Sequence, residues 1–126
     1  MVNYLIRKML FCSLCVVLAA SAQADTVKVK GQVMDVMIFA SNYQSYSSSD
    51  VGLANIYIDS PEMKSPCESG ATSGRIAISS DHPLFESVVS MAFIAKTTGK
   101  KVEMWHTGTC TLRSSSWDFA LIKFAE

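Results

Sequence analysis

Residues 81–99 read DHPLFESVVSMAFIAKTTG, and this stretch decides the fold because it is the one clear helical pattern after the N-terminal leader. Asp81 or Ser80 is expected to cap the helix, and Pro83 is tolerated there because its missing N–H would be unpaired in a first turn. Gly99 is expected to end it. At about 100° per residue, the core stripe consists of Leu84, Val88, Met91, Ala92 and Ala95.

The opposite face of this helix is polar, but two apolar side chains, Phe93 and Ile94, flank it. Scattered exposed apolar residues are ordinary on protein surfaces. The other interpretation is a second contact surface that meets a neighbouring molecule. On that interpretation the sequence predicts an oligomer interface made of Glu86, Ser90, Phe93 and Ile94.

Strand patterns surround the helix, three before it and two after it. They cover residues 26–39, 53–59, 75–79, 101–107 and 116–124. The order β-β-β-α-β-β is that of the five-stranded Greek-key barrel called the OB-fold. The sequence therefore predicts a mainly β fold with one helix in a single domain over residues 25–126, with a small sandwich as the structural alternative.

Two strands depart from a simple alternation. The apolar phase of the first strand flips between Val33 and Met34, just after Gly31, which predicts a bulge or a sharp coil. The last strand is apolar on both faces, from Trp117 to Phe124. Because a strand that is apolar on both faces is usually buried on both, another subunit is expected to cover one of them.

The first 24 residues have the organisation of a signal peptide. Arg7 and Lys8 precede an apolar run from Met9 to Ala20, and Ala22-Gln23-Ala24 provides small residues at a cleavage site. We expect cleavage after Ala24, a periplasmic or secreted location, and no membrane span in the mature chain, because the run is short for a bilayer.

The charge balance argues against nucleic acid as a partner. Without Arg7 and Lys8, residues 25–126 carry nine Lys and Arg against eleven Asp and Glu, a net charge of −2. A general nucleic-acid binder is expected to show a basic excess instead.

Two cysteines remain after the leader, Cys67 and Cys110. In an oxidising compartment an isolated pair is most simply one disulfide. The alternative is a metal site shared with His82 and His106, but the four residues lack the close spacing of metal-binding motifs. We therefore predict a disulfide, no metal and no other cofactor.

No sequence motif indicates catalysis, and a non-enzymatic protein is expected. His82, beside Pro83, is expected to lie on the surface or to cap the helix. His106 shares the inward parity of Met104, which predicts a hydrogen-bonded, half-buried side chain. Asp35 is expected to face solvent after the bulge.

A ligand-binding surface is the remaining functional prediction. Carbohydrate sites combine flat aromatic rings with hydroxyl and amide groups. These residue types occur in the loop after the first strand and on the fourth strand, at Asn42, Tyr43, Gln44, Ser45, Tyr46 and Trp105. The alternative is a solvated Ser-rich loop without a ligand.

The segment HPLFESVVSMAFIAKTTGKKVEMW, residues 82–105, resembles the B subunits of the bacterial A-plus-five-B toxins. It is similar to the subtilase-cytotoxin and typhoid-toxin branch, whose helix ends in Thr-Gly before a Val-rich strand. The resemblance implies an OB-fold, a homo-oligomeric ring of five subunits, a glycan receptor and a catalytic partner subunit. It assigns no sugar-contacting residue of this chain.

Three functions stay open at this point. The first is an exported binding subunit, homo-oligomeric, that recognises a glycan or a partner protein. The second is a monomeric periplasmic OB-fold domain that binds a small ligand or a cation. The third is a small hydrolase or nuclease that uses His82 or His106.

Overall fold

A computed structural model describes residues 25–40, 45, 47–63, 67 and 74–126. The predicted signal peptide, residues 1–24, lies outside this range, as do Asn42, Tyr43, Gln44 and Tyr46 of the predicted ligand-binding loop. Cleavage and export therefore stay predictions.

Five strands and one helix follow each other in the predicted order. They are β1 (Val27–Ala40), β2 (Gly52–Asp59), β3 (Arg75–Ser79), α1 (Phe85–Thr98), β4 (Lys101–His106) and β5 (Trp117–Phe124).

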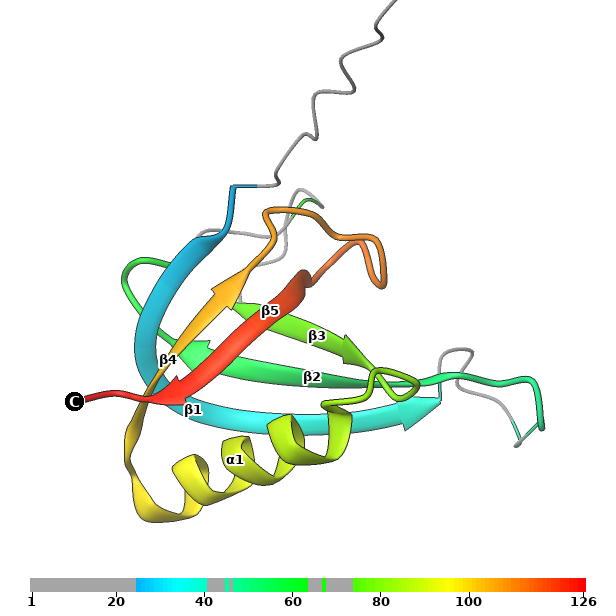
Figure 1. Cartoon of the computed structure of the whole chain (residues 1–126), viewed down its shortest axis with the longest axis horizontal. Helices are drawn as coiled ribbons and strands as arrows, with labels where there is room; N and C mark the ends of the chain where they lie inside the picture. The colour runs from blue at the N-terminus through cyan, green and yellow to red at the C-terminus, as the bar shows by residue number, and fades with distance from the viewer. Residues whose placement is uncertain (1–24, 41–44, 46, 64–66, 68–73) are drawn as a thin grey trace, which may run out of the picture.

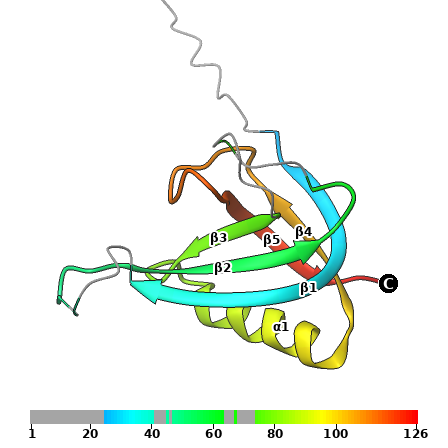
Figure 2. The same ribbon diagram turned by 180° about the vertical axis from the view of Figure 1, so that it is seen from behind.

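The strands form one sheet that closes on itself in the order β1-β2-β3-β5-β4 (Figures 1 and 2). All neighbours are antiparallel except β3 and β5, which pair in parallel. A single closed sheet excludes the two-sheet sandwich.

β1 holds the ring together because it pairs with two partners in succession. Its first half pairs with β4 and its second half with β2, and Gln32 faces both Lys101 and Asp59. The predicted irregularity is confirmed, since the register shifts between Val33 and Asp35. A Cβ atom at Gly31 would overlap the carbonyl oxygen of Asp59. Gly31 is therefore needed for a close approach of two strands at the bend.

The helix lies alongside β1 and covers one end of the ring (Figure 1). Val88, Ala92 and Ala95 are buried as predicted, but Leu84 is 51% exposed and Val89 is buried in its place. Met91 is only half-buried. Leu84 precedes the first helical turn, so the helical period does not govern its side chain. Val89 belongs to the same core cluster as Val88, Ala92 and Ala95.

The two helix ends differ from each other in how well they were predicted. Gly99 ends the helix in the left-handed conformation, with φ of 69°, as expected. The expected cap by Asp81 or Ser80 is wrong, because Leu84 occupies the N-cap position without a side-chain bond. His82 satisfies this end instead, since its Nδ1 accepts a hydrogen bond from the Leu84 N–H at 3.1 Å. The Asp81 carboxylate accepts from the Ser79 hydroxyl at 2.5 Å.

The hydrophobic core fills the ring between the inward faces of the strands and α1. Its most completely buried large side chains are Ile56, Ile76, Ile78, Met104, Val29 and Val102. β5 is less buried than predicted within this chain, because Leu121 is 45% exposed and Phe119 only partly covered. The expectation that another subunit covers β5 stays a prediction.

His106 is a polar member of this core; its predicted hydrogen bond is confirmed, but the side chain is buried and not half-buried as expected. It is 4% exposed and stacks on Trp117, with ring centroids 4.6 Å apart. Its Nδ1 accepts a hydrogen bond from the Gly108 N–H at 3.1 Å, which requires the neutral ring. Burial lowers the pKa of His106 below its ordinary value.

Acidification through the histidine range is expected to destabilise the protein. The unfolded chain takes up a proton at His106 near a pKa of about 6.5, whereas the folded chain resists it. The stabilisation is therefore complete above about pH 6.5 and is lost as the pH falls toward the lower pKa of the folded state, with a slope of at most about 1.4 kcal/mol per pH unit. Urea unfolding at pH 7.5 and at pH 5.5 measures this loss of folding stability.

The control for this pH dependence is His106→Asn, which keeps an acceptor and does not titrate. Its stability should change less between the two pH values than that of the parent protein. Equal changes in both proteins would contradict the assignment to His106.

Candidate binding site

The outward-facing residues of β2 and β3 form a partly covered surface that carries polar side chains. We call it the outer β2–β3 face, and it consists of Leu53, Asn55, Tyr57, Arg75, Ala77 and Ser79. The register pairs Tyr57 with Arg75, Asn55 with Ala77, and Leu53 with Ser79. The alternate residues of both strands, such as Ile56 and Ile76, point into the core.

This face is covered although it points away from the core. Asn55 is 2% exposed and Ala77 is fully buried. The loop between β4 and β5, residues 107–116, contributes to the cover, since Thr111 and Leu112 line a hollow of about 230 Å³ together with Ala77. The remaining lining residues of this hollow are Ile78, Ser79, Asp81, His82, Asp118 and Phe119.

Asp118 holds the loop in this position. Its carboxylate, 8% exposed, accepts hydrogen bonds from the Thr109 hydroxyl at 2.6 Å, from Thr111 N–H at 2.8 Å and from Leu112 N–H at 3.1 Å. Burial alone would raise the pKa of Asp118, but these hydrogen bonds outweigh it and keep that pKa below its usual value. Asp118 was not predicted from the sequence, because it lies between two aromatic residues in an apolar strand. The three threonines at 107, 109 and 111 were the available signal.

The predicted disulfide is confirmed and joins two loops at this site. Cys67 belongs to the β2–β3 connection and Cys110 to the β4–β5 loop, and their Cα atoms lie 6.1 Å apart. The Cys67 N–H also donates to the Cys110 sulfur at 3.2 Å. The bridge therefore ties the connection after β2 to the loop that covers the outer β2–β3 face.

Two arginines stack on aromatic rings at this site. The guanidinium carbon of Arg75 lies 4.8 Å from the centre of the Tyr57 ring. Arg113 of the covering loop lies 5.0 Å from the centre of the Phe39 ring, near the end of β1. Cation–π contacts of this kind fix the position of a guanidinium beside a ring, and the Arg113 Nε also donates a hydrogen bond to the Ser115 hydroxyl at 3.1 Å.

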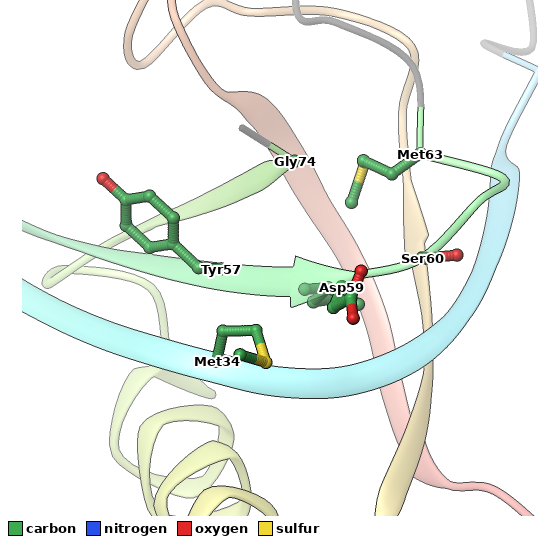
Figure 3. Close-up of a pocket in the computed structure, with 7 residues that line it drawn as sticks. Met34, Tyr57, Asp59, Ser60, Met63 and Gly74 are labelled. Atoms are coloured by element: carbon green, nitrogen blue, oxygen red, sulfur yellow. The ribbon is translucent and has the colours of Figure 1, made fainter. Parts of the chain in front are cut away.

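A larger hollow, of about 410 Å³, opens at the Tyr57 end of the face. Figure 3 shows Tyr57 from β2 and Met34 from β1 on one side of it, with Met63 and Gly74 across from them. Ile58, Asp59 and Ser60 complete its lining. Its volume lies in the range of small-molecule sites, and an aromatic ring, two thioethers and a carboxylate are suitable contacts for a sugar.

The structure separates the predicted ligand residues. Ser45 is exposed in the loop after β1, whereas Trp105 faces Lys28 near the start of β1, with the Lys28 nitrogen 6.0 Å from the ring centre. The other four predicted residues lie outside the described part. Phe39, near the end of β1, lies against Arg113 of the covering loop.

The predicted interface residues share the exposed side of α1. Glu86 and Ser90 are exposed, and Phe93 and Ile94 are 41% and 51% exposed. An apolar groove of about 250 Å³ runs beside them between α1 and β5, with Leu84, Met91 and Leu121 among its lining residues.

The remaining candidates have structural partners. His82 and His106 each accept a backbone N–H at Nδ1. Asp35 faces solvent as predicted and binds the Lys96 ammonium at 2.6 Å. Within the described ranges, no three His, Cys, Asp or Glu side chains lie together as a metal site would require.

Comparison with known proteins adds no relative to these observations. No protein-family model matches the chain, and no curated protein or solved structure matches it significantly. None of the helices in the described ranges is long and apolar enough to span a membrane.

Proposed function

We propose that the protein is an exported, non-enzymatic binding subunit with a five-stranded Greek-key OB-fold barrel. The strand order β1-β2-β3-β5-β4, the parallel β3–β5 pair and the helix between β3 and β4 support this fold. The long, bulged first strand that pairs with two neighbours supports it as well. Export rests on the signal-peptide pattern of residues 1–24 and is compatible with the disulfide.

The ligand proposed for this subunit is a glycan. OB-folds bind oligosaccharides and oligonucleotides on the face of strands 2 and 3 and on the loops that join β1 to β2 and β4 to β5. The single observation that carries the proposal is the coincidence of that face with the covered polar surface of this chain, flanked by the hollow of Figure 3. The net charge of −2 favours the sugar over the nucleic acid.

Removal of the Tyr57 ring is expected to weaken glycan binding at least tenfold. The ring lines the hollow and stacks on Arg75, so Tyr57→Ala removes both an apolar platform and the support of a guanidinium. A glycan array with the exported, processed protein identifies the ligand, and titration calorimetry gives the loss.

Two further variants locate the site. Tyr57→Phe keeps the ring and should retain most of the affinity. Trp105→Ala should bind like the parent protein if the outer β2–β3 face is the site. Loss of binding in Trp105→Ala, with Tyr57→Ala unaffected, would place the site on the opposite side of the ring. An array without any bound glycan would refute the lectin proposal.

A homo-oligomer is the second part of the proposal, and the exposed apolar side chains of α1 and β5 support it. The outer side of α1 carries Phe93 and Ile94 with one carboxylate, Glu86, and the adjoining groove is apolar. A face of this kind is typical of protein contacts.

Light scattering after size exclusion should report a multiple of the mass of one chain. Ile94→Glu should shift the protein toward the monomer, because a carboxylate in an apolar interface loses its hydration. Lys101→Glu, an exposed change outside α1, is the control. A monomeric parent protein at micromolar concentration would favour the second function, a monomeric OB-fold domain for a small ligand.

A further inference from the structure

Three buried polar atoms around the outer β2–β3 face have no hydrogen-bond partner among the described residues. They are Asn55 Oδ1, Arg75 Nε and Ser116 Oγ. Asn55 is 2% exposed and Ser116 is fully buried. Buried polar atoms in folded proteins are almost always bonded, so three of them in one region require an explanation.

The register shows that the three residues are neighbours. Ile76 pairs with Trp117, so Arg75 and Ser116, which precede them, lie side by side on β3 and at the start of β5. Arg75 also faces Tyr57 on β2, and Asn55 lies diagonally from it beside Ala77. Facing residues on adjacent strands have Cβ atoms about 5 Å apart and diagonal neighbours about 7–8 Å apart. Asn55 and Ser116 lie on opposite sides of β3, about two strand spacings of 4.8 Å apart, so a sugar ring that lies across β3 above Arg75, and not a single group, would be needed to reach all three.

The three atoms differ in hydrogen-bonding capacity. Arg75 Nε can only donate, Asn55 Oδ1 can only accept, and Ser116 Oγ can do both. A hydroxyl group accepts one hydrogen bond and donates another, so it suits a donor and an acceptor at the same time. A carboxylate could accept a hydrogen bond from Arg75 Nε. However, it would be repelled by the Asn55 oxygen and by the carboxylate of Asp118, because both residues pair with Ala77.

We propose that Asn55, Arg75 and Ser116 form a subsite for the hydroxyl groups of an uncharged sugar. The sugar ring would enter through the hollow that Tyr57 lines, and Tyr57 pairs with Arg75 across β2 and β3. The inference rests on the proposed glycan binding and narrows it to neutral sugars. It also explains why these polar atoms are unpaired within the described part of the chain, because their partners arrive with the ligand.

The test combines stability without ligand and binding with ligand. Ser116→Ala removes an unpaired hydroxyl, so the melting temperature of the free protein should stay equal or rise. Arg75→Lys keeps the positive charge and removes Nε. Both variants should bind a neutral glycan at least tenfold more weakly than the parent protein, measured with glucose, galactose and mannose glycosides. Ser80→Ala, at an exposed serine between β3 and α1, is the matched control and should change neither quantity.

The other possible outcomes distinguish failure of the subsite from failure of the glycan-binding function. Binding of sialylated or uronic-acid glycans alone would overturn the subsite and leave the lectin function standing. Binding of neutral glycans unaffected by Ser116→Ala and Arg75→Lys would do the same. A lower melting temperature for Ser116→Ala would show that an internal water already satisfies its hydroxyl, which also overturns the subsite. If no glycan binds the parent protein, the proposed function fails and the subsite fails with it.

Discussion

Gly31→Ala is expected to lower the free energy of unfolding by about 3 kcal/mol, or to prevent folding altogether. The new methyl group would overlap the backbone oxygen of Asp59 and approach the Ile58 side chain to 2.9 Å. A backbone atom of a central strand cannot move aside as the end of a side chain can. The strands would have to separate where β1 passes from β4 to β2, and this is the position that closes the ring.

Gly99→Ala provides the control, because it tests a different property of glycine. Gly99 has a φ of 69°, and nothing lies within 4 Å of the position that a methyl group would take, so alanine meets no obstacle there. Its cost should be that of the left-handed conformation alone, about 1 kcal/mol. Urea unfolding of both variants measures the difference. Similar losses at Gly31 and Gly99 would contradict a steric role for Gly31.

Removal of the disulfide is the second large effect, with an expected loss of about 4 kcal/mol. The bridge closes a loop between residues separated by 43 positions, and the cross-link restricts the unfolded chain more than the folded one. For a domain of about 100 residues this is a large part of the total stability. Cys67→Ser combined with Cys110→Ser, followed by thermal and urea unfolding, measures it.

The reductant dithiothreitol supplies an independent control. It should destabilise the parent protein toward the level of the double variant and leave the double variant unchanged. Equal stability of the parent and the double variant under oxidising conditions would refute the prediction. Glycan binding should weaken as well, since Cys110 lies in the loop that covers the outer β2–β3 face.

The prediction from sequence succeeded where a local pattern had a single explanation. The alternation in β4 placed Met104 and His106 on the inward face, where both are buried, and the glycine after a run of helix formers ended α1 at Gly99. The cysteine pair had one simple partner assignment. The irregularity in β1 was visible in the apolar phase, whereas the close approach of Asp59 to Gly31 was not.

It failed where a side chain's role depends on a partner distant in sequence. Asp118 reads as a polar interruption of an apolar strand until the threonines at 109 and 111 fold over it. Trp105 and the β1–β2 loop share a composition suited to sugars, but they adjoin opposite ends of β1.

The sequence by itself determined the order of the elements, the inward faces of β2, β3 and β4, the C-terminal end of the helix and the disulfide. Period and spacing encode these features within a few residues of the chain, and the helix of residues 85–98 is the clearest of them. Only the tertiary structure decided which outward-facing residues are covered. Closure of the ring places Asn55 of β2, Arg75 of β3 and Ser116 just before β5 on neighbouring parts of one sheet, although 61 positions separate Asn55 from Ser116 in the sequence and no local pattern records their proximity.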